Sequence, residues 1–167
     1  MGRFLAVLLV AGFSTAALAQ EPVGCDKFKW PLEQERAMLS KSNVKKIASG
    51  GKLEKMTSAV EVTLVPFADA KLPVAPERAP KDANSFAGFV RVARLRPAGR
   101  YKISLSGPAW IDVVRDKQFL KSIEFSGAQG CEGIRKSVKF DLPTAPILVQ
   151  VSAVPTNTIR VVITRDK

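Results

Sequence analysis

The chain has 167 residues, a size that suits one domain with its own apolar core, and 46% of its residues are hydrophobic. It carries 26 Lys and Arg against 15 Asp and Glu, which gives a formal net charge of +11. It contains no histidine, which supplies most general bases at neutral pH and most ligands for zinc, copper and non-haem iron. Ser-His-Asp and Cys-His catalysis, HExxH zinc sites and the two-His-one-carboxylate iron site are therefore excluded.

Residues 1–19 have the three zones of a secretory signal peptide. A single positive charge at Arg3 precedes the apolar run 4–13, and the segment ends in the small-x-small pattern Ala17-Leu18-Ala19. The apolar run is shorter than the roughly 20 residues that cross a bilayer, and no basic stop-transfer flank follows it. We therefore predict cleavage after Ala19 and a periplasmic or secreted protein without a transmembrane segment.

The sequence contains two cysteines, Cys25 and Cys131. An even number of cysteines in an exported protein usually forms disulfides. In the chain-entropy model, closing a loop of about 100 residues stabilises the fold by roughly 3–5 kcal/mol. A metal or redox pair is the alternative, but two thiols this far apart, without CxxC spacing or a histidine, do not favour it. We predict a structural disulfide.

A helix is predicted over residues 31–39, because Pro31 suits the first turn and the acidic residues after it meet the positive end of the helix dipole. One side of the helix is predicted to pack on the protein and the other to face water, with Leu32, Arg36 and Leu39 on the first side and Glu33 and Glu35 on the second. The basic stretch 41–55, broken by Gly50-Gly51, is predicted to be a frayed helix or a loop.

The chain is predicted to divide into an N-terminal helical segment packed on the core, residues 20–58, and a β-sandwich, residues 59–167. From Val60 onward apolar and polar residues alternate, which predicts strands. Residues 73–84, rich in proline, alanine and charge, are predicted to form an extended connection.

The turn Arg96-Pro97-Ala98-Gly99 has proline at its second position, where the fixed φ of proline fits. It predicts a hairpin with one apolar and one polar face, with Val90 opposite Leu105 and Val92 opposite Ile103 on the first, and Arg91, Lys102 and Ser104 on the second.

Two further connections, at 143–146 and at Pro155, predict a meander of three strands with one shared apolar face. The predicted neighbours are Leu142 with Ile147, Phe140 with Val149, Val138 with Val151, Val151 with Ile159, and Val149 with Val161, and the outer residues are Lys139, Asp141 and Gln150.

A fourth hairpin is predicted to turn at Asp116-Lys117, which sets Val114 against Phe119 and Asp112 against Lys121. About eight strands with short connections are therefore expected. The predicted fold class is mostly β: a single antiparallel β-sandwich with a short N-terminal helix.

Lys and Arg residues gather in three groups, at 41–55, 91–102 and 135–139. In the predicted hairpin Arg91 and Lys102 are diagonal neighbours, and like charges placed together cost stability, so their concentration favours an anionic partner. The alternative is that a basic surface only keeps the protein soluble. Nucleic acid is not favoured, because only 7% of the residues are aromatic. The candidate anion-binding residues are Arg91, Arg94, Arg100, Lys102, Arg135 and Lys136.

Trp110 and Asp112 are candidates for contact with a glycan. They would lie on one strand and could line a sugar-binding or glycosidase cleft. The alternative, favoured because tryptophan is usually well buried, puts Trp110 in the core and pairs Asp112 with Lys121. No catalytic residue, metal site or cofactor is predicted.

Several segments resemble an uncharacterised family of small exported proteobacterial proteins. They are GCDKFKWP at 24–31 with the helix after it, WIDVV at 110–114, FSG at 125–127, Cys131, and IRKSV at 134–138. The resemblance covers most of the chain after the predicted signal peptide. It implies export, a disulfide between the two cysteines and one domain, and it implies no activity.

The expected function is therefore that of an exported, non-enzymatic β-sandwich protein that binds an anionic component of the cell envelope or an acidic partner protein. Two alternatives stay open. The first is a carboxylate-based enzyme that acts on glycans. The second is an accessory structural subunit of a periplasmic complex.

Overall fold

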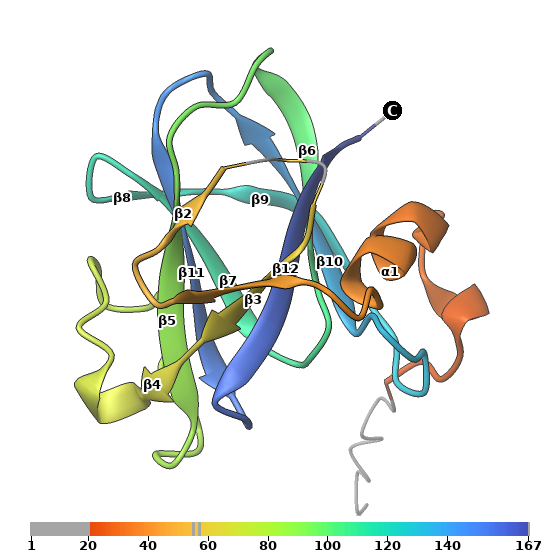
Figure 1. The fold of residues 1–167 in the computed structure, drawn as a ribbon, viewed down its shortest axis with the longest axis horizontal. Coiled ribbons are helices and arrows are strands. Elements are labelled where there is room, and N and C mark those ends of the chain that lie inside the picture. The colour runs from red at the N-terminus through yellow and green to blue at the C-terminus, as the bar shows by residue number, and fades with distance from the viewer. Residues whose placement is uncertain (1–20, 55, 57, 167) are drawn as a thin grey trace, which may run out of the picture.

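The computed structural model describes residues 21–166 except 55 and 57, so the predicted signal peptide lies outside the described residues. No helix in this part of the chain is long and apolar enough to cross a membrane. The described residues form twelve strands, one α-helix and two short 3-10 turns. The strands lie in two sheets that pack face to face (Figure 1).

Each sheet draws its strands from distant parts of the chain. Sheet 1 has the order β1 (Lys45–Ala48), β3 (Val60–Thr63), β12 (Thr158–Arg165), β6 (Gly99–Leu105), β10 (Lys136–Leu142) and β9 (Ser122–Gly127). Sheet 2 has the order β2 (Lys52–Leu53), β5 (Phe86–Val92), β11 (Ile147–Val154), β7 (Trp110–Arg115) and β8 (Gln118–Leu120), and β4 (Val65–Pro66) also pairs with β5. The helix is α1 (Glu33–Leu39), and the 3-10 turns are η1 (Cys25–Lys27) and η2 (Phe67–Asp69).

The predicted fold class, a mostly β sandwich with a short N-terminal helix, is confirmed. The strand count is higher than the expected eight. The sheets are mixed rather than purely antiparallel, because β1 with β3 and β2 with β5 form parallel pairs. The predicted frayed helix or loop over 41–55 is wrong, since β1 and β2 lie there. The connection 73–84, called the linker below, has neither helix nor strand, as predicted.

Three predicted hairpins are wrong. β5 and β6, β10 and β11, and β11 and β12 are neighbours in the chain, but the members of each pair lie in opposite sheets. Their apolar residues do point into the core as predicted: Val90, Val92, Ile103 and Leu105 are each at most 2% exposed. They belong to one core cluster between the sheets rather than to the two strands of a hairpin. Alternation identifies the buried face of a strand, and a hairpin and a crossing between sheets satisfy it equally.

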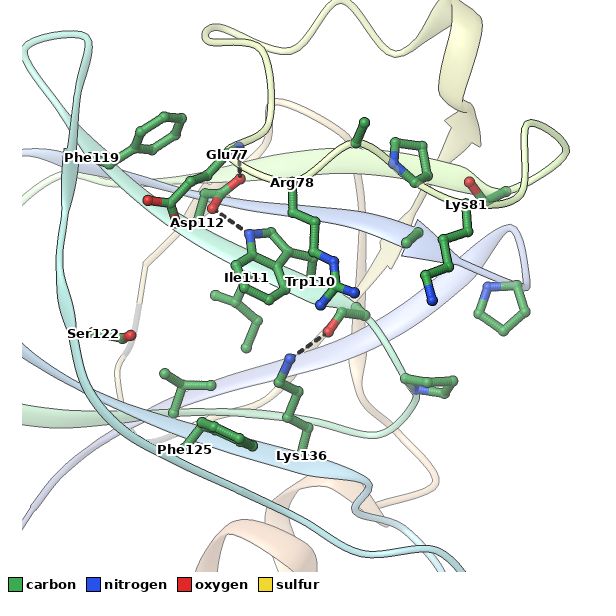
Figure 2. Close-up of a pocket in the computed structure, with 18 of the residues that line it drawn as sticks. Glu77, Arg78, Lys81, Trp110, Ile111, Asp112, Phe119, Ser122, Phe125 and Lys136 are labelled. Carbon is green, nitrogen blue, oxygen red and sulfur yellow. Dashed lines mark hydrogen bonds between the residues drawn. The ribbon is translucent and has the colours of Figure 1, made fainter. Parts of the chain in front are cut away.

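The hairpin of β7 and β8 is confirmed, with Val114 paired to Phe119. The predicted pairing of Asp112 with Lys121 is wrong, because β8 ends at Leu120. Asp112 instead accepts hydrogen bonds from the Trp110 indole N–H and from the backbone N–H of Glu77 (Figure 2).

Helix α1 packs on the outer face of sheet 1. Leu32 and Leu39 are buried as predicted, but Glu35, which was expected to face water, is only 1% exposed. It shares a helix face with both leucines, at spacings of three and four residues. The Nζ atom of Lys102 lies 2.8 Å from Glu35 Oε1, and Thr164 Oγ1 donates a hydrogen bond to the same oxygen. Arg36, predicted on the packed side, is exposed.

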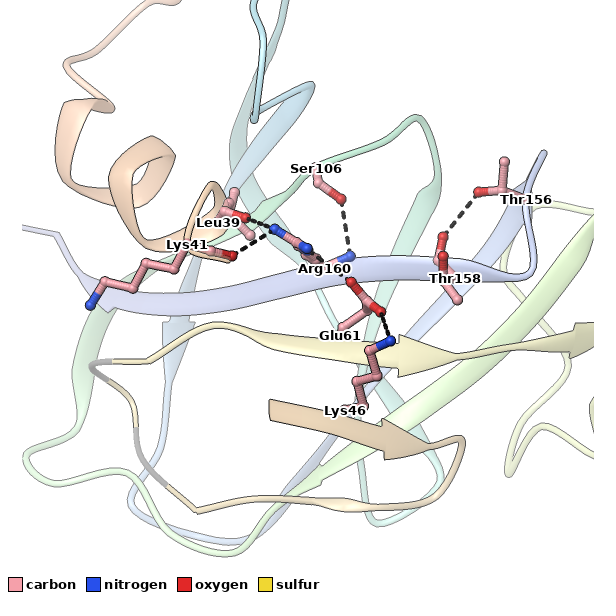
Figure 3. Close-up of polar contacts among 8 residues, drawn as sticks. All are labelled: Leu39, Lys41, Lys46, Glu61, Ser106, Thr156, Thr158 and Arg160. Carbon is pink, nitrogen blue, oxygen red and sulfur yellow. Dashed lines mark hydrogen bonds and ion pairs between the residues drawn. The ribbon is translucent and has the colours of Figure 1, made fainter. Parts of the chain in front are cut away.

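Arg160 joins α1 to two strands of sheet 1 (Figure 3). Its Nε donates to Glu61 Oε2 on β3 at 2.9 Å. Its Nη1 donates to the carbonyl oxygens of Leu39 and Lys41 at 2.8 and 3.0 Å, at the C-terminal end of the helix. The hydrogen bond and the charge of Arg160 hold the pKa of Glu61 below its usual value of 4.5, against the effect of burial, and Lys46 adds a smaller contribution.

Cys25 and Cys131 form the predicted disulfide, with their Cα atoms 4.8 Å apart. Cys131 lies between β9 and β10, where it packs with Leu32, Leu39 and Ile134 in a small apolar cluster separate from the main core. The disulfide therefore ties the N-terminal segment to the sheet that α1 covers.

We expect the substitution Arg160→Gln to lower the free energy of unfolding by about 2–3 kcal/mol at pH 7, because charge-assisted hydrogen bonds to Glu61 and to the helix carbonyls are lost. A carboxyl whose pKa is lowered by folding stabilises the protein above its unfolded pKa, and this contribution is lost as the pH falls through the folded pKa. The difference between wild type and variant should therefore narrow below about pH 4.5. Urea unfolding of both proteins at pH 7 and pH 3 measures this difference in the free energy of unfolding.

The matched control is Arg165→Gln, on the same strand but exposed, which should change stability little at either pH. A difference between wild type and Arg160→Gln that is the same at both pH values would contradict the role given to Glu61.

We expect reduction of the disulfide to lower the melting temperature by several degrees, on the order of 10 °C, because the unfolded chain regains the entropy that the closed loop removed. Thermal unfolding followed by circular dichroism, with and without reductant, measures the shift. The double substitution of both cysteines by serine should reproduce it. An unchanged melt after reduction verified by mass spectrometry would count against a stabilising role.

Candidate functional site

A cavity of about 650 Å³ lies at the corner where the chain passes from β8 in sheet 2 to β9 in sheet 1. β8 and β9 follow one another with only Lys121 between them, yet β8 pairs with β7 in sheet 2 and β9 pairs with β10 in sheet 1. β7 and β10 therefore lie in different sheets on either side of the corner. Residues of both strands, of the corner and of the linker line the cavity (Figure 2). Its volume is within the range of small-molecule sites.

The floor of the cavity is the end of the main apolar core. Ile111, Val138 and Phe140 line the cavity and also belong to the core cluster. Leu120, at the corner, lines the cavity and packs against the same cluster. An apolar group that enters the cavity would therefore contact the core itself.

Three more exposed aromatic side chains also line the cavity: Trp110, Phe119 and Phe125. Phe119 is 36% exposed and Phe125 is 65% exposed. Phe125 pairs with Val138, a core residue, so it is on the inner face of sheet 1 but lies where sheet 2 does not cover it. Large apolar side chains exposed together usually mark a binding surface.

Three cationic side chains, those of Arg78, Lys81 and Lys136, line the same cavity. The Arg78 Cζ atom lies 5.5 Å and the Lys136 Nζ atom 5.2 Å from the centre of the Trp110 ring, both within cation–π range. Lys136 Nζ also donates to the carbonyl oxygen of Ala109 at 2.8 Å. Burial lowers the pKa of Lys136 from 10.5, and the nearby charges of Arg135 and Arg78 lower it further.

Asp112 holds the indole and the linker in place. It is 4% exposed; its Oδ1 accepts from Trp110 Nε1 at 2.7 Å, and its Oδ2 accepts from the N–H of Glu77 at 3.2 Å. Burial raises the pKa of Asp112 above 3.8, although both hydrogen bonds act in the opposite direction. Both carboxylate oxygens are thus engaged with the protein. Asp112 is a positioning residue for the cavity wall.

Besides Asp112, the acidic residues Glu21, Glu77 and Asp82 line the cavity, and Glu21 and Asp82 have partners of their own. Glu21 forms an ion pair with Arg135 and accepts a hydrogen bond from Gln129 Nε2. Asp82 accepts a hydrogen bond from the backbone N–H of Asn84 at 2.9 Å. Within the described chain no ion pair is found for Arg78, Lys81 or Lys136, so these three cations are available to an anionic ligand.

The six predicted anion-binding residues do not form one site. Lys136 lines the cavity and Arg135 lies beside it in an ion pair. Lys102 is paired with Glu35, and Arg100 Nε lies 3.9 Å from Asp141 Oδ1.

Two of these residues lie elsewhere. Arg94 lines a shallow hollow with Arg96 and Thr144, and Arg91 lines a different hollow on sheet 2. The predicted neighbours Arg91 and Lys102 lie in opposite sheets, on β5 and β6.

Trp110 and Asp112, predicted as candidates for glycan contact, do lie together in the cavity. Trp110 is partly exposed rather than in the core. Sequence reasoning missed Arg78, Lys81, Phe119 and Phe125 as site residues. The only signal for the first two was the charge within the proline-rich linker.

No family model, curated protein or solved structure matches this chain. The candidate site is therefore argued from its own geometry, which is that of a β-sandwich with one open corner lined by aromatic and cationic side chains. In the part of the chain that the structure describes, no three His, Cys, Asp or Glu side chains are grouped to hold a metal ion.

We expect Asp112→Asn to lower the free energy of unfolding by about 1–3 kcal/mol, because Trp110 and Glu77 donate to different oxygens of Asp112 and the amide replaces one of these oxygens by an NH2 group, which leaves one N–H without its acceptor. A carboxyl whose pKa is raised by folding binds its proton more tightly in the folded state, so its contribution to stability falls as the pH rises from 3.8 through the folded pKa. The difference in the free energy of unfolding between wild type and Asp112→Asn should therefore be larger at pH 3 than at pH 7.

Urea unfolding across this pH range measures the effect, and Asp116→Asn, at the exposed turn after β7, is the control. An advantage of wild type that grows toward neutral pH would contradict the burial argument for Asp112.

Proposed function

We propose that this chain is a non-enzymatic binding protein that holds an anionic, amphiphilic component of the cell envelope in the cavity. The observation that carries the proposal is that three aromatic and three cationic side chains line the same cavity as residues of the apolar core. An apolar portion of a ligand gains by leaving water on that floor. An anionic head group gains from the cations at the rim, where partial burial reduces screening by salt.

The position of Trp110 supports this assignment. Its indole is held by Asp112 and contacted by Arg78 and Lys136. Cations that already lie against an aromatic ring lose less conformational entropy when they bind an anion. The ring also offers a flat face to the apolar part of the ligand.

Export is part of the proposal and rests on the sequence of residues 1–19. A disulfide between Cys25 and Cys131 is typical of proteins outside the cytoplasm. In that compartment the abundant anionic amphiphiles are envelope lipids and their fragments. An acidic partner protein is the alternative ligand.

The glycan-acting enzyme is the less supported candidate. Its key residue would be Asp112, and a catalytic carboxylate must act on the substrate as an acid, a base or a nucleophile. Here both oxygens of Asp112 accept hydrogen bonds from Trp110 and Glu77. No feature of the structure specifically favours an accessory structural subunit.

Trp110 provides a direct test, because the chain has two tryptophans and the substitution Trp30→Phe leaves one indole, in the cavity. With this variant, we expect dodecyl phosphate below its micelle concentration to change Trp110 fluorescence in a saturable way. Dodecanol and inorganic phosphate should bind at least about tenfold more weakly, since each lacks one of the two interactions. Raising the salt to 0.5 M, where the screening length is about 4–5 Å, should weaken binding.

The substitution Lys136→Gln should weaken dodecyl phosphate binding by about tenfold, while Lys121→Gln, an exposed lysine at the same corner that does not line the cavity, should not. Equal affinity for dodecyl phosphate and dodecanol, or binding that neither salt nor Lys136→Gln changes, would overturn the proposal.

A further inference from the structure

A second hollow, of about 330 Å³, lies at the C-terminal end of β7, where Val114 in the hollow pairs with Phe119 in the cavity. The cavity includes Trp110, at the start of that strand, whereas the hollow includes Val114 and Arg115, at its end. Pro73 and Val74, at the start of the linker, line the hollow. The cavity and the hollow have no lining residue in common.

The strand register defines the surface of the hollow. Lys52 on β2 pairs with Arg91 on β5, Arg91 pairs with Leu148 on β11, and Leu148 pairs with Val114 on β7. The next residue in β5, Val92, belongs to the core, so this row lies on the outer face of sheet 2. The row begins with two cations and continues with two apolar side chains.

The opposite side of the hollow is also cationic. Arg115 and Lys117, from the end of β7 and the turn to β8, line it there. Asp116 is the one carboxylate among the described residues that line the hollow, and its Oδ2 lies 3.2 Å from Arg115 Nε. In the described part of the chain no ion pair is found for Lys52, Arg91 or Lys117.

The placement of Lys52 beside Arg91 is unfavourable for folding alone, because like charges directly opposite on neighbouring strands repel. The guanidinium group of Arg91 is held in place by Phe89, because its Cζ atom lies 5.6 Å from the centre of the Phe89 ring. An anion bound between these side chains would remove the repulsion. An equivalent anion at Lys117 would lie on the other side of Leu148 and Val114.

Neighbouring strands are about 4.8 Å apart, so β5 and β7, which are two interstrand steps apart, lie about 10 Å from each other. We propose that this hollow is a second binding site, for an elongated dianion whose two negative groups lie about 10 Å apart at the ends of an apolar frame. One group binds at Lys52 and Arg91, the frame lies over the partly exposed Leu148, above the buried Val114, and the other group binds at Lys117. This proposal does not depend on the ligand of the cavity.

The test uses decanedioate, which has a carboxylate at each end of a ten-carbon chain, with decanoate and butanedioate as the comparison probes. Binding is followed by the NMR shifts of the backbone amides of Arg91, Lys117 and Leu148 in the full-length protein. We expect decanedioate to bind about fivefold more tightly than decanoate, which lacks the second charge, and than butanedioate, which is too short to span the hollow. Equal affinities at these amides, or shifts confined to the cavity, would overturn the proposal.

The substitutions Arg91→Gln and Lys117→Gln should each remove most of the advantage of decanedioate over decanoate. Arg91→Lys, which keeps the charge, should retain it, and Arg94→Gln, an exposed arginine outside the hollow, should have no effect. An advantage that survives both glutamine variants would refute the site.

These experiments test the two proposed sites independently. If the hollow is wrong and the cavity is right, Trp110 fluorescence still responds to dodecyl phosphate while decanedioate shows no advantage at Arg91 and Lys117. If only the proposal for the hollow is correct, decanedioate shows its advantage at Arg91 and Lys117 while Trp110 fluorescence does not respond to dodecyl phosphate. Arg91→Gln should leave the Trp110 response unchanged.

Discussion

The apolar core between the two sheets is the interaction on which the rest of the structure depends. Residues from both sheets, such as Ile103, Val113 and Val149, meet there and are almost fully buried. The core must end where the chain leaves one sheet for the other, and β8 and β9 make that passage around a single residue. Phe125 marks the end: it keeps the inward orientation of its strand yet is 65% exposed. The cavity is thus the uncovered end of the core, and its apolar floor is a consequence of the fold.

The same core explains which parts of the fold could be predicted from the sequence. The alternation of apolar and polar residues correctly identified the inward-facing side chains, including Val90 and Leu105, because burial depends only on the period within a strand. It could not identify the neighbouring strand, because most connections lead from one sheet to the other. A strand that begins the opposite sheet alternates in the same way as one that forms a hairpin. Glu35 was misplaced for a related reason: its burial depends on Lys102 and Thr164, which the fold brings beneath the helix from distant segments.

The candidate site was predictable only in part, and Phe119 and Phe125 were missed although they lie on strands. Trp110 and Asp112 share one face of β7, two residues apart, and the sequence was sufficient to consider them together. Lys136 was noted for its charge alone. Arg78 and Lys81 lie in a linker with no period, so their positions follow from how the linker is attached, and that attachment involves contacts that no local pattern encodes.

The attachment of the linker connects the two proposed sites. Gln150 exchanges two hydrogen bonds with the backbone of Val74, and Asp112 accepts one from Glu77. Both side chains are on the outer face of sheet 2, as alternation requires, yet both are buried because the linker covers them. A buried polar group without a partner costs about 1–3 kcal/mol, so release of the linker is opposed at both points. The linker therefore runs in a fixed position from Val74, which lines the hollow, to Arg78, which lines the cavity. In both proposed sites the linker is therefore ordered by the fold itself, and its ordering is a cost of folding rather than of binding.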